Sequence, residues 1–363
     1  MPYKKIAVIS DVHSNYEALQ SVIAHAHRRG VEDVWFLGDA VGYGPDPHRC
    51  LKLLAETVTQ PDAWVLGNHD EAMRYPPNGM DITDMDQKTI GSPSLQAQIN
   101  SISCYIGTNP DTFNAFRTNF EILDAFPDRR NFLLSHPDRS QIGRRIHLVH
   151  GGVRSDTPTT TYTADRVQVQ DEFGLSIFKI TQNSLDNLRV EKIPLHILNS
   201  LESLKEQEFI GEDKLLDLIQ AIIGDRPNGK WKSIIVQHTF HAHKRRFQDP
   251  RLHIFFFGHT HLPACYKGTN ALDEPGCDNG NFIEYDLKEE TEIHLDEKHA
   301  WFLNPGSVGQ PRDGDPRASY MLLDRGSNIL RRHRVEYNIR ATQKQMEDYG
   351  MPSNLIRRLT PGR

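Results

Sequence analysis

Short apolar runs alternate with amphipathic segments in the N-terminal part of the chain. Runs of apolar residues at 5–9, 31–37 and 63–66 predict β-strands. Between the first two runs, apolar residues recur at the spacing of one helix face; these are Leu19, Val22, Ile23 and Ala26. Strands separated by helices pair in parallel through right-handed crossovers, so this pattern predicts an α/β fold.

Local polar signals predict where helices begin. Ser14-Asn15-Tyr16-Glu17 predicts a capping box, in which Ser14 and Glu17 satisfy each other's free main-chain amides. Asp46-Pro47 predicts the start of a second helix that runs through Leu54. A weaker helical periodicity over 112–126 predicts a further helix.

The second half of the chain returns to the strand pattern after an interruption. An apolar run at 145–149 predicts a strand, whereas 154–250 contains helix-like stretches and no strand-then-loop rhythm. Further strands are predicted at 252–257, 282–287, 291–295, 300–303, 318–323 and 329–337, the last of them antiparallel. We therefore expect one domain over 1–340, interrupted by an insertion or cap at 154–250, and a helical tail at 341–363.

Polar and titratable residues follow the predicted strands. On extended backbone, Asp11 and His13 project to the same face, because strand side chains alternate with period two. In parallel sheets ligands bind beyond the carboxyl ends of the strands, so we expect one site there, at the edge of a single sheet. The residues found at these ends are Asp11, His13, Asp39, Asn68, His69, Asp70, His150, His259 and His261. Oxygen and nitrogen ligands without thiolate favour Mn, Fe or Zn.

Each of these motifs also has an ordinary structural interpretation. Asp11 and Ser14 are common turn and cap residues, and Gly38-Asp39 is a common turn. A histidine after a strand is often a core or loop residue. The repeated coincidence with strand ends favours a shared site.

Composition and charge narrow the classes of function. Hydrophobic residues make up 37% and charged residues 25% of 363 residues, which predicts a folded chain. The 42 Lys and Arg against 48 Asp and Glu give a net charge of −6, so nucleic acid is not an expected partner. Apolar runs are strand-sized, far below the ~18 residues of a membrane span. No signal-peptide pattern precedes Lys5, and we expect a cytoplasmic protein with no membrane partner.

The ordered motifs resemble the calcineurin-like metallophosphoesterase family. They are Asp11-x-His13, Gly38-Asp39, Gly67-Asn68-His69-Asp70, His150 and Gly258-His259-x-His261. The variants Gly42-Tyr43-Gly44-Pro45 and Asn304-Pro305-Gly306-Ser307 are similar to its bacterial and archaeal small-phosphoesterase branch. The resemblance implies two mixed β-sheets sandwiched between helices, here with an inserted, partly helical segment.

The resemblance also implies a dinuclear site. By it, Asp11, His13, Asp39 and His261 hold one divalent ion, and Asp39, Asn68, His150 and His259 hold the second, with Asp39 bridging. It implies hydrolysis of a phosphate monoester or diester through attack of a metal-bound hydroxide. His69 is then the general acid, and Asp70 orients its imidazole. We therefore expect the substrate to be a phosphorylated small molecule, nucleotide or protein.

Two alternatives stay open. The Ser/Thr protein phosphatases of the family carry an arginine that binds phosphate where Gly42-Tyr43-Gly44 stands here, so this activity is less favoured. A non-catalytic metal-binding interaction protein is the alternative from another class, but it would be expected to lack ligands, and here every position is filled. Arg154 and Arg312 follow site motifs and are candidates to contact substrate phosphate. The 154–250 segment is either a cap that sets substrate choice or a peripheral or dimer-forming decoration.

Overall fold

The structure is a computed structural model that divides into two compact units. The first comprises Met1–Arg166, Pro250–Gly268 and Ile283–Arg363, and the second comprises Val167–Asp249 and Thr269–Phe282. The residues described are 5–77, 93–152, 159–160, 174–203, 210–211, 218–222, 235, 240–245, 253–268, 282–297 and 299–363. All predicted site residues belong to the first unit.

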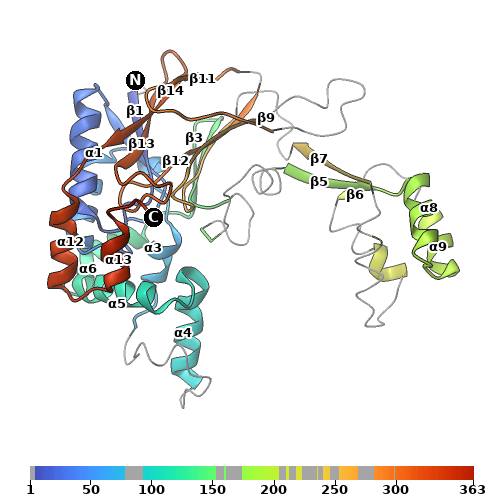
Figure 1. Cartoon of the computed structure of the whole chain (residues 1–363), viewed down its shortest axis with the longest axis horizontal. Helices are drawn as coiled ribbons and strands as arrows, with labels where there is room; N and C mark the ends of the chain where they lie inside the picture. Colours follow the sequence, from blue (N-terminus) through green and yellow to red (C-terminus); the bar gives the residue numbers. More distant parts are fainter. Residues whose placement is uncertain are drawn as a thin grey trace. The chain divides into compact units, whose positions relative to one another are not determined.

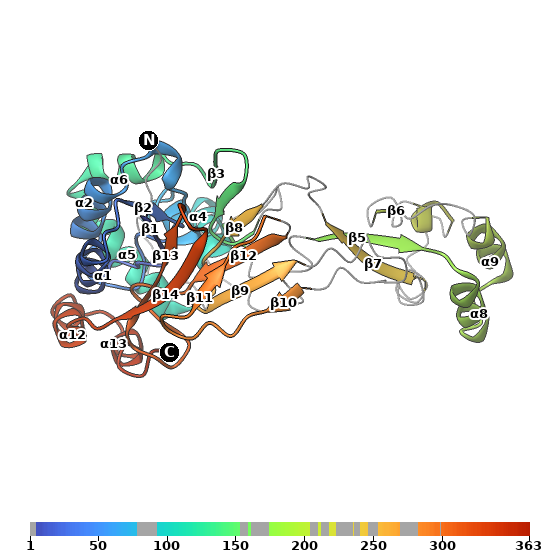
Figure 2. The ribbon, with the colours of Figure 1, turned by 90° about the horizontal axis from the view of Figure 1, so that it is seen from above.

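Two mixed sheets form the first unit (Figures 1 and 2). The five-stranded sheet has the order β11 (Glu292–His294), β14 (Ile329–Val335), β13 (Ala318–Asp324), β1 (Lys5–Ile9) and β2 (Asp33–Phe36). The six-stranded sheet has the order β10 (Phe282–Glu284), β9 (Pro263–Gly268), β12 (Ala300–Pro305), β8 (Ile254–Phe256), β4 (Ile146–Val149) and β3 (Arg139–Ile142). Parallel pairs join β1 to β2, β4 to β8 and β8 to β12. Antiparallel pairs join β1 to β13, β13 to β14, β14 to β11, β9 to β12 and β3 to β4. The predicted architecture of two mixed sheets with helices is confirmed.

The apolar run of β1 is buried on both faces. Ala7 and Ile9 belong to a core shared with the helices, whereas Ile6 and Val8 belong to a core shared with the six-stranded sheet. Successive side chains of a strand point to opposite faces, so a strand between two apolar layers has no polar positions. This explains why β1 has an unbroken apolar run.

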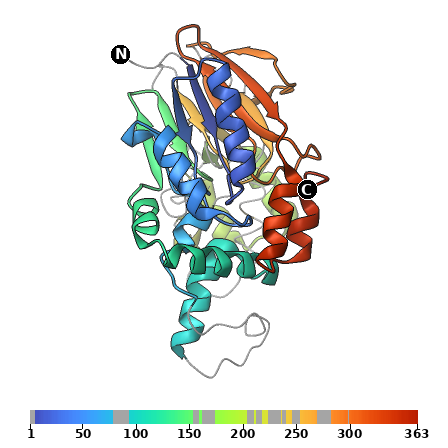
Figure 3. The ribbon, with the colours of Figure 1, turned by 90° about the vertical axis from the view of Figure 1, so that its left-hand side faces the viewer.

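Helices cover the other face of the five-stranded sheet (Figure 3). They include α1 (Tyr16–Arg28), α2 (Pro47–Thr57), α5 (Pro110–Asp124) and α6 (Pro127–Leu134), which share one apolar core with β1, β2 and β13. The short α3 (Asn68–Ala72) is followed by α4 (Pro93–Ile106), and α12 (Ile339–Asp348) and α13 (Ser353–Arg358) end the described chain.

The start of α1 differs from the prediction. Asn15, not Ser14, caps the helix: its side-chain oxygen accepts a hydrogen bond from the amide of Ala18 at 3.3 Å. Ser14 has φ +55° and its hydroxyl pairs with Asn119, so it belongs to the turn that precedes the helix. The second helix begins as predicted, with Asp46 accepting from the amide of Arg49 and Pro47 as the first residue.

The predicted strand at 63–66 is not a regular strand. Pro61–Ala63 forms a 3-10 turn, and Trp64 makes a single parallel bridge with Phe36. The polar motif that follows begins the short helix α3 at Asn68. The strands β3 and β9 were not predicted, and β3 is an edge strand that alternates exposed and half-buried residues, so it has no apolar run to mark it.

The second unit has its own core. Its strands β6 (Ile210–Gly211), β5 (Gly174–Lys179) and β7 (Phe240–Arg245) form an antiparallel sheet with β5 in the centre. The helices α8 (Gln182–Val190) and α9 (Leu195–Glu202) bury apolar residues that include Leu185, Leu188 and Leu201. Here the sequence predicted helices but not the sheet.

In the part of the chain that the structure describes, no helix combines the length and the apolar character needed to cross a membrane.

The core between the two sheets sets the stability of the first unit. Phe256 has no exposed surface and packs edge-to-face against Trp35, with ring centroids 5.9 Å apart. We expect Phe256→Ala to lower the free energy of unfolding by about 3–5 kcal/mol, because it leaves a cavity. Urea denaturation followed by tryptophan fluorescence measures this. The control Tyr349→Ala, at a side chain 53% exposed, should cost less than about 1 kcal/mol. Equal unfolding midpoints for the two variants would contradict the assignment of this core.

Candidate metal centre

The candidate site lies where loops from the two sheets meet. Asp11 follows β1 and Asp39 follows β2 in one sheet, whereas His150 follows β4 and His259 follows β8 in the other. The expectation that all motifs end strands of one sheet is therefore wrong. The motifs still converge, because the sheets pack face to face and the loops leave at the same edge.

Main-chain hydrogen bonds connect these loops. The amide of Asp11 donates to the carbonyl of Gly38 at 3.0 Å, and the amide of His13 donates to Asp39 at 2.9 Å. In the other sheet the amide of Gly258 donates to the carbonyl of His150 at 2.7 Å. The imidazole Nδ1 of His150 lies 2.7 Å from the carbonyl oxygen of Leu37, which connects the two pairs of loops.

The ligand-bearing residues occupy left-handed backbone. Five of the candidate ligands have positive φ: Asp11 (53°), His13 (45°), Asp39 (58°), His259 (64°) and His261 (61°). The extended conformation expected for Asp11-x-His13 is therefore wrong, and their convergence comes from a tight turn. A non-glycine residue in this region costs roughly 1–3 kcal/mol, and such residues cluster at functional sites.

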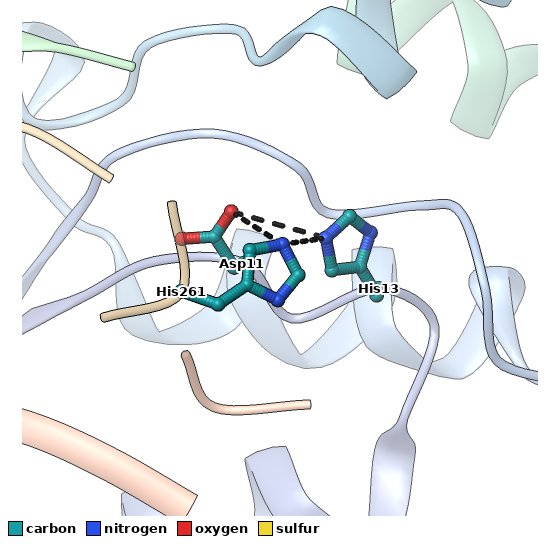
Figure 4. Close-up of side chains that lie close together, drawn as sticks. All are labelled: Asp11, His13 and His261. Atoms are coloured by element: carbon teal, nitrogen blue, oxygen red, sulfur yellow. Dashed lines mark hydrogen bonds and ion pairs between the residues drawn. The ribbon is translucent and has the colours of Figure 1, made fainter. Parts of the chain in front are cut away.

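One group comprises Asp11, His13 and His261 (Figure 4). The Oδ1 atom of Asp11 lies 3.4 Å from Nε2 of His261 and 3.8 Å from Nε2 of His13. The two Nε2 atoms are 3.0 Å apart. Neither carboxylate oxygen of Asp11 has a hydrogen-bond partner among the described residues, although the side chain is fully buried.

The surroundings of these imidazoles assign their tautomers. Nδ1 of His13 lies 3.0 Å from the carbonyl oxygen of Val41, and Nδ1 of His261 is hydrogen-bonded to the carbonyl of Gln310. A carbonyl oxygen only accepts, so each Nδ1 carries the proton and each neutral ring presents an Nε2 lone pair. Two facing lone pairs beside an unpartnered carboxylate repel one another, and a cation bound among them would remove this repulsion. The donor set therefore fits a metal ion.

A second group comprises Asp39, His150 and His259. Oδ2 of Asp39 lies 3.2 Å from Nε2 of His150 and 3.5 Å from Nε2 of His13, so this carboxylate stands between the two groups. The side-chain oxygen of Asn68 lies 3.1 Å from Nε2 of His150, while its amide donates to the carbonyl of Tyr105 at 2.8 Å. That second hydrogen bond directs the Asn68 oxygen toward the site.

Burial controls the electrostatics of the cluster. Burial, with the nearby charge of Asp39, raises the pKa of Asp11 to about 7. Burial opposes the charge on Asp39 as well, but His150 and His69 outweigh it and lower the pKa of this carboxyl. Burial lowers the pKa of His259 to about 3 and the pKa of His13 far below its usual value. Burial opposes the charge on His150 too, but Asp39 and Asp11 outweigh it and raise the pKa of His150 to about 9. A divalent cation binds neutral imidazoles and carboxylates, so its binding would release the proton of His150.

His69 lies beside both groups. Its main-chain amide donates to Oδ1 of Asp39 at 2.9 Å, and its ring packs edge-on against His13 with centroids 4.9 Å apart. Its Nδ1 is buried and has no hydrogen-bond partner among the described residues. His69 also forms a ligand-like group with His13 and Asp39. Its imidazole is therefore available either for proton transfer or for metal binding.

The position of Asp70 differs from the prediction that it orients the His69 imidazole. Its carboxylate accepts hydrogen bonds from the main-chain amides of Asp39 (2.8 Å), Gly67 (3.0 Å) and Val41 (3.2 Å). Asp70 is fully buried in the first turn of α3, and its oxygens satisfy nearby amides rather than the ring. Asp70 thus holds the loop that carries Asp39.

Asn119 on α5 is a site-supporting residue that the sequence analysis missed. Its side-chain oxygen accepts from the amide of Gly42 at 3.0 Å, and its amide donates to the carbonyl of Gly44 at 2.8 Å. The feature that could have indicated it is a polar residue on the buried face of a helix, beside Phe116 and Phe120.

Of the two candidate phosphate contacts, Arg154 lies outside the described residues, and Arg312 lies close to the site.

Three comparisons agree with this geometry. The family model for calcineurin-like phosphoesterases matches residues 4–263. An uncharacterized protein from Methanocaldococcus jannaschii is 26% identical over 368 residues, which cover 99% of this chain and 98% of the relative. The crystal structure of a metallophosphoesterase from Sphaerobacter thermophilus is 25% identical, covers 99% of this chain and 100% of its own, and has a TM-score of 0.56.

A hypothetical protein from Pyrococcus horikoshii, 15% identical over 99% of this chain and 98% of its own, shares the fold with a TM-score of 0.51. The family match covers most of the chain and includes the motifs whose residues meet between the two sheets. The chain therefore belongs to the calcineurin-like phosphoesterase family.

Proposed function

We propose that this chain is a dinuclear metal-dependent phosphoesterase that hydrolyses a phosphate monoester or diester. The observation that supports this most directly is the position of Asp39, whose carboxylate lies within 3.2–3.5 Å of an imidazole from each ligand group. A carboxylate between two ligand groups is suited to bridge two ions. The family is dinuclear and metal-dependent, and the substrate is a phosphorylated small molecule, nucleotide or protein.

The ligands divide into two sets. Asp11, His13, Asp39 and His261 would hold one ion, and Asp39, Asn68, His150 and His259 the other. This mixture of imidazole and oxygen ligands suits Mn, Fe or Zn. A pair of bound divalent ions supplies an acidified water as nucleophile and neutralises charge on the phosphoryl oxygens.

His69 would donate the proton that the leaving oxygen requires. Its ring is buried next to the ligand groups, and its Nδ1 has no hydrogen-bond partner among the described residues. Burial lowers the pKa of His69 to about 4, but a phosphate dianion beside the ring favours the imidazolium. Asp70 would act indirectly, as a positioning residue for Asp39.

Metal-dependent turnover tests the proposal. Chelator-stripped protein is titrated with Mn²⁺ and assayed with p-nitrophenyl phosphate and bis-p-nitrophenyl phosphate. We expect metal to restore hydrolysis and the preferred ester to distinguish phosphatase from phosphodiesterase activity. Asp39→Asn should lose both ions and at least about 100-fold in kcat/KM, since even outer-shell changes cost 10–100-fold. Elemental analysis measures the metal content.

Asp46→Asn is the matched control. Asp46 caps α2 outside the cluster, and asparagine caps equally well, so this variant should keep both ions and full activity. Two ions per chain in Asp39→Asn would contradict the bridging role. No turnover of either ester by fully metal-loaded protein would favour a non-catalytic metal-binding protein or a highly selective site.

His69→Ala tests the general acid separately. We expect this variant to retain both ions and to lose about 10²- to 10⁴-fold in the hydrolysis of phenyl phosphate, whose leaving group needs a proton. The loss with p-nitrophenyl phosphate should be much smaller, because p-nitrophenolate leaves without protonation. Measured kcat values for the two esters give the comparison. Equal losses with both esters would exclude proton donation, and a loss of metal would make His69 a ligand.

A further inference from the structure

Two arginines flank Tyr43 next to the candidate metal centre. The Tyr43 ring centroid lies 4.7 Å from the ring of His13 and 4.7 Å from the ring of His69. The guanidinium carbon of Arg312 lies 5.7 Å from the Tyr43 centroid, and that of Arg358 lies 5.6 Å from it. Both distances are within the range of a cation–π contact. Arg312 lies in the loop between β12 and β13, and Arg358 ends α13, so tertiary structure brings them together.

A small cleft adjoins this cluster. Its free volume is about 10 Å³, which is room for roughly one water molecule. Its lining includes His13 and Tyr43 on the side of the ligand cluster, and Met346, Leu355 and Leu359 from α12, α13 and the residue after it. The C-terminal helices therefore contribute a wall to the space beside the metal-ligand residue His13.

The nearest acidic residues in sequence are paired elsewhere. Asp313 pairs with Arg334, and Asp315 pairs with Arg317 at 2.7 Å. Among the described residues Arg312 itself donates only to neutral oxygens, at 3.2 Å to Gln310 and 3.4 Å to the Tyr43 hydroxyl, and its buried Nε has no partner there. Arg312 thus has no carboxylate partner over the described residues.

Arg358 is in the same situation. Its Nε donates to the main-chain carbonyl of Arg363, and within the described ranges no Asp or Glu side chain pairs with it. Burial and the charge of Arg312 lower the pKa of Arg358. Two neighbouring guanidinium groups without an acid are costly, and a bound anion would offset this cost. Arginine's planar donors suit the tetrahedral oxygens of phosphate.

The two arginines are connected to the ligand cluster in different ways. Arg312 donates to the side-chain oxygen of Gln310 at 3.2 Å, and the main-chain carbonyl of Gln310 is hydrogen-bonded to Nδ1 of His261. Arg358 contacts the ring of Tyr43 instead, and among the described residues no hydrogen bond or ion pair joins it to a candidate ligand. Arg312 is therefore connected more directly to the ligand cluster than Arg358 is.

We propose that Arg312 and Arg358 form an anion subsite that receives a second phosphate group of the substrate, beyond the phosphoryl group held at the ligand cluster. This rests on the proposed function and names its substrate class: an organic bisphosphate or a nucleoside di- or polyphosphate. Arg312 lies between the two phosphates, and Arg358 binds the outer one.

Calorimetric titration of the full-length, Mn²⁺-loaded protein tests the subsite without turnover. The probes are methylenediphosphonate, which has two phosphonate groups, and methylphosphonate, which has one. We expect Arg358→Gln to weaken diphosphonate binding about tenfold and methylphosphonate binding less than about twofold, the loss of one charge-assisted contact. Arg312→Gln should weaken both. Arg358→Lys, which keeps the charge, should bind diphosphonate more tightly than Arg358→Gln.

Arg357→Gln is the matched control, because Arg357 is an exposed neighbour on α13 whose guanidinium donates to Asn354 at 2.9 Å. It should bind both probes with the affinity of the parent protein. Chelation of free Mn²⁺ by the diphosphonate affects all variants equally, so it does not change the comparison between them. Equal diphosphonate affinities for Arg358→Gln and Arg357→Gln would overturn the inference. Equal losses with both probes in Arg358→Gln would also overturn it. Absence of ester hydrolysis would contradict the proposed function, whereas the affinities for the two probes test the anion subsite alone.

Discussion

Buried negative charge is the constraint on which the rest of the first unit depends. Asp11 and Asp39 are almost completely inaccessible, and they lie beside imidazoles whose Nε2 atoms point inward. Taking a carboxylate out of water costs several kcal/mol unless a cation or strong hydrogen bonds compensate. Asp39 accepts the amide of His69, but Asp11 has no hydrogen-bond partner among the described residues. The cluster is therefore built to be completed by cations.

The sheets supply the rigidity that this arrangement requires. Left-handed turns at Asp11 and Asp39 are unfavourable in isolation, and they persist because the preceding strands β1 and β2 are packed on both faces. Asp70 adds three hydrogen bonds to the main chain around Asp39. Packing in the two cores thus stabilises loop conformations in which the ligand side chains converge.

Asn15 connects the C-terminal helix α12 to the same loops. Asn15 caps α1, its amide donates to the carbonyl of Gly309 at 2.9 Å, and its oxygen accepts from the Thr342 hydroxyl of α12 at 2.9 Å. Asn15 follows His13 by two positions, so the turn that presents a ligand also fixes where the tail packs. The α13 helix is held beside Tyr43 by apolar packing of Met346, Leu355 and Leu359 against this ring.

The sequence by itself determined the family and most of the elements of the first unit. The apolar runs of β1 and β2 and the Asp46 cap are local signals that predicted an α/β fold. The order of the motifs indicated the family, and the resemblance to the family implied two mixed sheets. Only the tertiary structure decided that the motifs leave two different sheets, that Asp70 binds amides rather than His69, and that Arg358 reaches Tyr43. These outcomes depend on packing between residues far apart in the chain, which neither periodicity nor spacing encodes. The sequence gives each side chain directly, but the packing of distant segments determines which group a buried polar side chain contacts.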